Sequence, residues 1–324
     1  MLVFLIRRLM QSGLVLFLMS LVVFVGVFAI GNPIDMLINP EADQEDIEAA
    51  IRALGLDRPL WEQYLYFLGN ALRGDLGNSF IFNEPALQLI LERMPATLEL
   101  AVSAMVIAII LGIPLGMLAG MYPESILGRS IMAGSILGFS LPTFWVGLLL
   151  IMLFAVELGW LPSTGRGETV EVLGLHVSFL TWDGLTHLFM PALNLALFKM
   201  SLVIRLARAG VRENMQLDYV KFARAKGLSS ARVILVHVTK NIMIPIVTVL
   251  GLELGSVIAF AVVTETIFAW PGMGKLIIDS IDLLDRPVIV AYLMITVLMF
   301  IIINLIVDLV YCVLDPRIRL GDMK

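Results

Sequence analysis

The sequence contains, at residues 288–312, the stretch VIVAYLMITVLMFIIINLIVDLVYC, in which Asp308 is the only charged side chain. About 20 predominantly apolar residues are enough for a helix to cross a hydrocarbon core of ~30 Å. Lipid offers no hydrogen bonds to the backbone, and a continuous rather than alternating apolar run therefore indicates a helix. Similar runs occupy residues 9–30, 96–121, 130–158, 188–208 and 244–267. The sequence predicts an all-α polytopic membrane protein with six transmembrane helices.

The composition agrees with this reading. Of 324 residues, 59% are hydrophobic and 15% charged, whereas soluble domains contain about 45–50% apolar and about 25% charged residues. The net charge of -5 argues against a nucleic-acid partner, which selects basic surfaces. The run 9–30 is longer than the apolar core of a signal peptide, so we expect a retained first span. The single cysteine, Cys312, lies in an apolar run and allows no internal disulfide.

The lysines and arginines predict the orientation of the chain. Fourteen of the 22 precede the first span, follow the sixth, or lie in the 122–129 loop and between the fourth and fifth spans. With six spans these segments share one side of the membrane, and basic residues mark the cytoplasmic side. Both termini are therefore expected in the cytoplasm. Kinks are expected where proline removes a backbone donor, at Pro114, Pro142, Pro191 and Pro245.

Two external segments follow from this topology. Residues 31–95 are acidic at first, with helical spacing at 45–54 and an amphipathic, aromatic stretch at 61–68, before Gly74 and Gly77 break the pattern. The segment is either a solvated loop with interfacial aromatic residues or an outward cap that receives a docking partner. Residues 159–187 contain three glycines and a proline in their first nine positions and predict a turn-rich loop.

The cytoplasmic segment 209–243 is too polar to span the membrane and too long for a tight turn. A helix is expected at 218–226, with Gly227 at its end, where a left-handed residue is often needed. Ser229 or Ser230 can cap a second helix. The basic face of this helix pair could contact anionic lipid headgroups; alternatively, the pair inserts into a cytoplasmic protein.

Two charged residues are expected near the middle of the membrane. Lys199 lies ~16 Å from the outer end of the fourth span, and Glu253 ~14 Å from the inner end of the fifth, at 1.5 Å per residue. A charge at this depth costs roughly 2.5–3.5 kcal/mol on insertion scales and usually faces a cavity or a partner. The two groups either pair or line an aqueous path. Otherwise Lys199 extends toward the interface and Glu253 is protonated.

Several kinds of catalytic site are absent from the sequence. The phosphate-binding pattern GxxxxGK[ST] does not occur. His176, His187 and His237 are scattered, so no metal cluster can be read from neighbouring residues. A nucleophile motif of the form GxSxG is also missing. A secondary transporter or channel remains an alternative, with Glu253 as its ion-coupling carboxylate.

The cytoplasmic segment resembles the Glu-Ala-Ala loop of ABC importer permeases, in the form carried by the dipeptide/oligopeptide/nickel family. The matching residues are 218–220, 223–227, Arg232, His237, Asn241 and Pro245. Lys221 and Phe222 replace the glutamate and first alanine of the general signature, as is usual in this subfamily. Further matches are LGLDRP (54–59), RGDLG (73–77), PATLEL (95–100), SLPTFW (140–145), ETIFAWPG (265–272), VDL (307–309) and DPR (315–317). The acidic external region is similar to that of the B-type subunit.

The resemblance implies a type I ABC importer permease in a bacterial inner membrane. Its partners would be a second homologous permease, two cytoplasmic ATPases, an external solute-binding protein and membrane lipid. ATP and magnesium would be bound by the ATPases, so this chain would need no cofactor and would not be an enzyme. The contact with an ATPase would involve Ala223, Arg224, Ala225, Lys226, Gly227 and Arg232. Peptides, nickel, glutathione, opines and sugars all remain possible substrates.

The expected organisation has four parts. Residues 1–30 form the cytoplasmic N-terminus and first span, and 31–95 the external domain. Residues 96–312 form a five-helix core that includes the segment 209–243, and 313–324 form a cytoplasmic tail.

Overall fold

The computed structural model describes residues 2–29, 45, 48, 51–52 and 57–314. The predicted helix at 45–54 and the tail at 313–324 lie largely outside the described residues, as does the side chain of Cys312. The described residues form two compact units. One lies within 1–94 and Gly272–Ile302, and the other within Pro95–Pro271 and the end of the last helix from Ile303. The helices α5 (Ala86–Met121) and α13 (Arg286–Leu314) each contribute to both units.

In the first unit, an aromatic cluster joins α1 (Leu2–Ala29) to α4 (Leu60–Ala71). The Tyr64 ring packs edge-on against Phe24, with 5.3 Å between ring centroids. The Tyr64 hydroxyl and Ser20 Oγ are 2.9 Å apart and form a hydrogen bond. The amphipathic helix predicted at 61–68 is therefore confirmed, and its aromatic face contacts the first apolar helix.

The first unit also contains α12 (Met273–Asp282) and the start of α13. The turn before α13 is fixed by Asp285, whose carboxylate accepts hydrogen bonds from Ser79 Oγ and from the backbone N–H of Phe80. Asp285 and Ser79 are both buried. Gly74 and Gly77, predicted to break the helical pattern, have φ values of 81° and 88°. These turns lie between α4 and α5.

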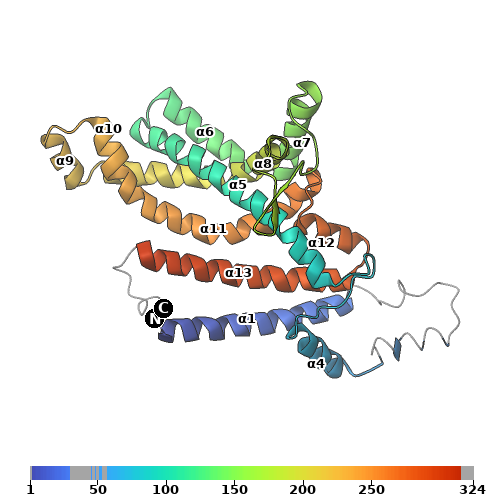
Figure 1. Ribbon diagram of the computed structural model, residues 1–324. Helices are drawn as coiled ribbons and strands as arrows, with labels where there is room; N and C mark the ends of the chain where they lie inside the picture. The colour runs from blue at the N-terminus through green and yellow to red at the C-terminus, as the bar shows by residue number, and fades with distance from the viewer. Residues whose placement is uncertain (1, 30–44, 46–47, 49–50, 53–56, 315–324) are drawn as a thin grey trace. The chain divides into compact units, whose positions relative to one another are not determined.

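The second unit is built around two long helices, α8 (Trp182–Asn214) and α11 (Thr239–Ile267), which pack side by side (Figure 1). At one end of this pair lie α9 (Asp218–Ala225), α10 (Ser230–Arg232) and the π-helix η2 (Val233–Val238). At the other end lies a loop with the antiparallel strands β1 (Val170–Val172) and β2 (Leu175–Val177). The sequence did not predict this hairpin within the loop 159–187.

A glycine stripe brings α5 close to α8. Gly112, Gly116 and Gly120 recur every fourth residue and so lie on one face of α5. A Cβ on Gly116 would lie 2.5 Å from the carbonyl oxygen of Ile204, and one on Gly112 would lie 2.9 Å from the side chain of Val203. Small residues at this spacing allow membrane helices to approach closely.

The prolines for which kinks were expected, Pro114, Pro191 and Pro245, lie inside helices α5, α8 and α11.

The expected single span at 130–158 is broken. It consists of α6 (Ile126–Ser140), then α7 (Thr143–Leu150) continued by the π-helix η1 (Ile151–Glu157), with a bend of 107° between the two parts. The sequence predicted a kink at Pro142, but the helix ends at Ser140, because the residue before a proline is disfavoured in the α conformation. Five other described helices are long and apolar enough to cross a membrane, which gives six spans if the bent pair is one.

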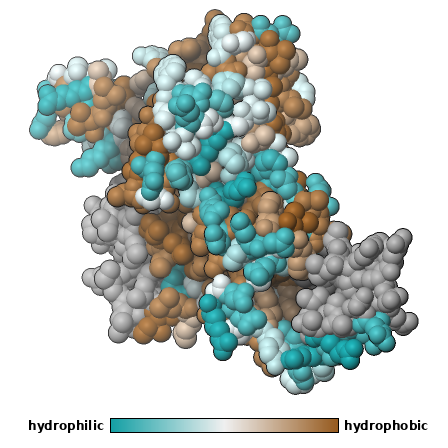
Figure 2. Space-filling model, turned by 45° about the vertical axis from the view of Figure 1, so that its right-hand side comes forward, coloured by the Kyte–Doolittle hydropathy of each residue, from teal (hydrophilic) through white to brown (hydrophobic). Residues whose placement is uncertain are grey.

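Hydrophobic side chains cover much of the surface of the described helices, as Figure 2 shows in brown. Large exposed examples on the broken span and α11 are Ile136, Leu137, Phe144, Trp145 and Leu252. An apolar exterior is what a helical membrane protein requires, because lipid tails rather than water surround it.

Candidate functional site

Within the segment 209–243, a short helix, α9, packs against η2. In α9, Val220 and Ala223 are buried, and α9 packs on η2. The Tyr219 hydroxyl donates to Asn214 Oδ1 over 2.7 Å, which ties the start of α9 to the end of α8. The helix is therefore positioned by contacts within its own chain.

Gly227 ends this helix in the left-handed conformation, with φ of 76°. The N–H groups of Gly227 and Leu228 donate to the carbonyl oxygens of Arg224 and Ala223, over 2.9 and 3.3 Å. Ser229 then caps α10 by accepting from the N–H of Arg232. The predicted turn and cap are confirmed, and a Cβ added at Gly227 would meet no atom within 4 Å.

The six residues predicted for an ATPase contact do not all face outward. Ala223 is only 7% exposed, because it packs toward its own chain. Arg224, Ala225, Lys226, Gly227 and Arg232 are exposed. The ammonium of Lys226 lies 4.6 Å from the ring centroid of Phe222, which is itself exposed. The free surface of the segment is thus a small basic patch with one aromatic ring. The buried Ala223 lies on the opposite side of α9, which packs on the rest of the chain.

Lys199 on α8 and Glu253 on α11 form an ion pair. The Lys199 ammonium donates to Glu253 Oε2 over 2.5 Å and to Ser256 Oγ over 2.6 Å. Ser256 Oγ also lies 2.8 Å from Glu253 Oε2 and can donate to it. The side chain of Lys199 is 3% exposed and that of Glu253 33%. The structure therefore brings together the two intramembrane charges that the sequence singled out.

Aromatic rings surround this pair. The Lys199 ammonium lies 5.1 Å from the ring centroid of Phe198 and 5.8 Å from that of Phe260. Phe139, at the end of α6, stacks on Phe198 with 4.8 Å between centroids. The Arg205 guanidinium lies 5.0 Å from the Phe139 centroid. The break in the third span therefore lies beside the ion pair.

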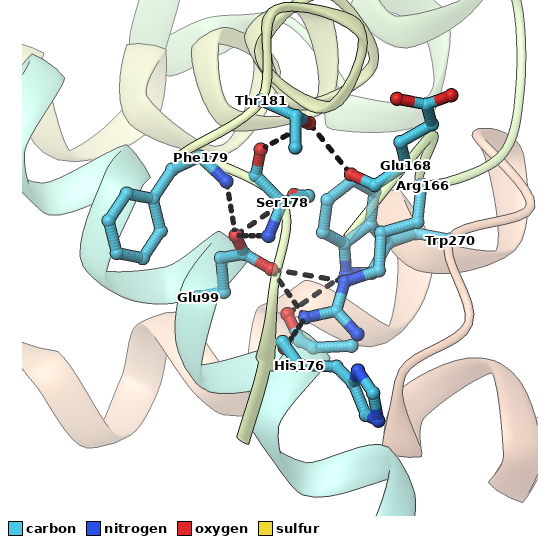
Figure 3. Close-up of polar contacts among 9 residues, drawn as sticks. Glu99, Arg166, Glu168, His176, Ser178, Phe179, Thr181 and Trp270 are labelled. Carbon is cyan, nitrogen blue, oxygen red and sulfur yellow. Dashed lines mark hydrogen bonds and ion pairs between the residues drawn. The ribbon is translucent and has the colours of Figure 1, made fainter. Parts of the chain in front are cut away.

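A third polar cluster, centred on Glu99 of α5, fixes the loop that carries the β1–β2 hairpin (Figure 3). Glu99 Oε1 accepts from the N–H and Oγ of Ser178 and from the N–H of Phe179, over 2.6, 2.9 and 2.9 Å. Glu99 Oε2 accepts from Arg166 Nε and Nη2, over 3.0 and 2.6 Å. Trp270 Nε1 donates to the carbonyl oxygen of Ala96 over 2.9 Å. Ala96 lies about one helical turn before Glu99 on α5.

This cluster was missed by the sequence interpretation. The signal was available, because Glu99 is a carboxylate inside the predicted span 96–121, and a buried charge needs a partner. Its partners could not be found by spacing, since Arg166 and Ser178 lie 67 and 79 residues further along the chain. Among the described residues, no group of three or more His, Cys, Asp or Glu side chains could hold a metal ion.

Comparison with known families decides the class of this protein. Residues 112–320 match the family described as "Binding-protein-dependent transport system inner membrane component", and residues 1–101 match the N-terminal component of such membrane proteins. The chain belongs to this family. It is a permease of the ABC importer class, and the alternative of a secondary transporter or channel is not favoured.

Curated relatives of this inner membrane component cover nearly its whole length. The di/tripeptide transport system permease protein DppB of Pseudomonas aeruginosa is 39% identical over 302 residues, which are 89% of this chain and 90% of the relative. The glutathione transport system permease protein GsiC of Escherichia coli is 38% identical, covering 98% and 99%. The dipeptide transport system permease protein DppB of Escherichia coli K12 is 37% identical, with the same coverage. These relatives are transport permeases rather than enzymes.

A solved structure of the methionine ABC transporter MetNI, in an inward-facing conformation, has a chain of similar fold. The TM-score is 0.53 at 13% identity, over 70% of this permease and 97% of the solved chain. At this identity the likeness concerns the fold alone. It agrees with the predicted type I importer fold.

Proposed function

We propose that this permease forms half of the membrane path of an ATP-driven importer of short peptides or a related small solute. The observation that carries the proposal is the segment α9–α10, which lies between α8 and α11 in the chain. This segment presents an exposed basic patch. A second homologous permease would complete the path. Two cytoplasmic ATPases would bind such segments, and an external solute-binding protein would deliver the substrate.

In this proposal ATP and magnesium are bound only by the ATPase partners. Both termini and α9–α10 lie in the cytoplasm, as the distribution of lysine and arginine favours. Residues 31–95 and the loop with the β1–β2 hairpin then face outward, toward the solute-binding protein. The parts remain those expected from the sequence, with 1–30, 31–95, 96–312 and 313–324 as the four regions.

The packing of the second unit supports a mechanical route from the ATPase to the membrane. A helix bound by an ATPase moves when the ATPase dimer closes, and Tyr219 and the buried Val220 connect α9 to α8 and η2. Because η2 continues into α11, the displacement is carried to both flanking spans. We propose that the Lys199–Glu253 pair borders the path that these spans open and close, as expected for a site near the midplane, with Glu253 as its exposed member.

The substrate class is inferred from the relatives. Their names specify dipeptides, di- and tripeptides, and glutathione, all of which carry charged groups on a short peptide backbone. We therefore propose a short peptide as the transported solute.

The experiment that tests the coupling role uses two glycines in the same conformation. Gly227→Val and Gly174→Val both place a side chain in the left-handed region, at φ of 76° and 81°, and at both positions an added Cβ meets nothing within 4 Å. Each change costs about 1–3 kcal/mol of backbone strain. We expect both variants to reach the membrane in normal amounts, while only Gly227→Val uncouples peptide uptake from ATP hydrolysis.

The measurement is ATP-dependent uptake, together with ATPase activity, in vesicles that hold the whole complex. Co-purification of ATPases with the tagged wild-type chain tests the assembly itself. Normal uptake by Gly227→Val would refute the coupling role of this turn. Equal loss in both variants would mean that strain alone explains the defect.

A further inference from the structure

The ion pair in the second unit is asymmetric, and its exposed member is the carboxylate. Lys199 is 3% exposed and its ammonium contacts both Glu253 and Ser256, whereas the Glu253 side chain is 33% exposed. The contacts with Lys199 and Ser256 both use Oε2 of Glu253. A carboxylate has about four acceptor sites on its two oxygens. The pair therefore presents a negative edge to its surroundings.

The rings beside the pair already hold cations. Lys199 lies 5.1 Å from the centroid of Phe198, and Arg205 lies 5.0 Å from that of Phe139. A cation within about 6 Å of an aromatic centroid is attracted by the ring. Phe260 is the most exposed ring of this cluster, at 58%, and it lies seven residues after Glu253, on the same face of α11.

Lys199 shows that one ammonium group can reach both the carboxylate and this ring. Its nitrogen is 2.5 Å from Glu253 Oε2 and 5.8 Å from the Phe260 centroid. A second ammonium approaching from the exposed side would have the carboxylate between itself and Lys199. The order cation, anion, cation is electrostatically favourable, while a solute carboxylate would meet the negative edge first.

We propose that the exposed edge of Glu253 and the face of Phe260 bind the primary ammonium group of the transported solute. The inference rests on the proposed function and makes it more specific, because it selects peptides with a free amino terminus. Lys199 is a positioning residue, which holds the carboxylate in place and balances its charge. The site is a transient one, because a path residue must also release its solute.

The test uses two matched tripeptides that carry a photoreactive leucine at the second position, one with a free amino terminus and one N-acetylated. The whole complex is reconstituted in proteoliposomes, and each peptide is supplied at a concentration that saturates the binding protein by calorimetry. ATP-dependent uptake and the crosslinked segment of this chain are then measured. The variants are Glu253→Gln and Phe260→Leu, with Glu124→Gln as a control at an exposed carboxylate on another loop.

We expect the free-amine peptide to crosslink to the 250–262 region of wild type. Glu253→Gln should lower its crosslinking and uptake about tenfold, the loss expected when about 1.4 kcal/mol of ammonium binding is removed. The ratio of free-amine to acetylated uptake should fall by the same factor. Phe260→Leu should lower this ratio less, by about fivefold, and Glu124→Gln should leave it unchanged.

An equal loss for both peptides in Glu253→Gln and in Phe260→Leu would overturn the inference, because it would mean that these residues only support the helix. Crosslinks that map elsewhere and do not respond to Glu253→Gln would overturn it as well. In both cases wild-type uptake would still support the proposed function. If wild type takes up neither peptide with ATP, the proposed function fails, and the inference fails with it.

Discussion

The hydrogen bonds around Glu99 predict a large local effect of a small substitution. Glu99→Gln keeps the size of the side chain but removes the charge that five donor contacts share. The Arg166 side chain, only 12% exposed, would then lack its counterion. Breaking one partner of a buried ion pair costs about 3–5 kcal/mol. The N–H groups of Ser178 and Phe179 would also face an amide that has one acceptor fewer.

This energy should appear as opening of the loop that carries the β1–β2 hairpin rather than as unfolding of the helices. The backbone of α5 is hydrogen-bonded within the helix, whereas residues 166–179 are held to it through side chains. A loss of about 3 kcal/mol from a local opening equilibrium corresponds to roughly 100-fold faster hydrogen exchange. The measurement is amide exchange of the purified variant by mass spectrometry, with Glu92→Gln, an exposed carboxylate on the same helix, as the control.

Unchanged protection of Ser178 and Phe179 in Glu99→Gln would refute this reasoning. The double variant Glu99→Gln with Arg166→Gln gives a second check, because it removes the unpaired charge as well. Residues in direct contact are expected to couple by about 0.5–3 kcal/mol. The double variant should therefore exchange more slowly than the sum of the two single effects predicts, and simple additivity would mean that the pair contributes nothing.

Three other predictions concern the topology, the ion pair and the glycine stripe. A cysteine at Glu45 should react with a membrane-impermeant reagent in intact cells, and labelling only after lysis would reverse the topology. Glu253→Gln and Lys199→Met should each lower uptake, and the double variant should be less impaired than the worse single one; defects that simply add would count against a functional pair. Gly116→Ala should destabilise the detergent-purified protein by about 1–3 kcal/mol, because the added Cβ would lie 2.5 Å from the Ile204 carbonyl oxygen. The measurement is the melting temperature, and an unchanged value would show that α5 and α8 can separate freely.

The features that the sequence predicted well depend on local physics. A long apolar run must be helical in lipid, so the spans were found to within a few residues at several ends. The conformation of Gly227 and the cap at Ser229 were also predictable, because the residue types required at helix ends are few. The aromatic face of α4 was visible as a helical repeat. The packing of its Tyr64 against Phe24 of α1 was not predictable from that repeat.

The features that it did not predict depend on contacts between distant residues. The sequence indicated a kink at Pro142, but the angle of 107° depends on how α6 and α7 pack against α8. The β1–β2 hairpin has three residues in each strand, too short for an alternating pattern to stand out. The inward position of Ala223 depends on η2, a helix form that spacing alone does not indicate.

The contacts between α8 and α11 bear on how the proposed coupling could reach the membrane centre. The two helices are joined near one end by Asn194 Nδ2, which donates to Thr264 Oγ1 over 3.1 Å, and at mid-length by the Lys199–Glu253 pair. Near α9, Gly210 lies so close to Ile242 that an added Cβ would be 2.8 Å from its side chain. Helices fixed to each other at three levels resist sliding independently.

Under the proposed function, a displacement of α9 would therefore move α8 and α11 together, and the ion pair with them. The gap through which a solute passes would then have to open between this helix pair and the second permease, rather than between α8 and α11. The exposed edge of Glu253 and the exposed ring of Phe260 lie on the outside of the pair, where such a gap would expose them. The ion pair can thus hold the moving helices together while its exposed member, Glu253, meets the solute.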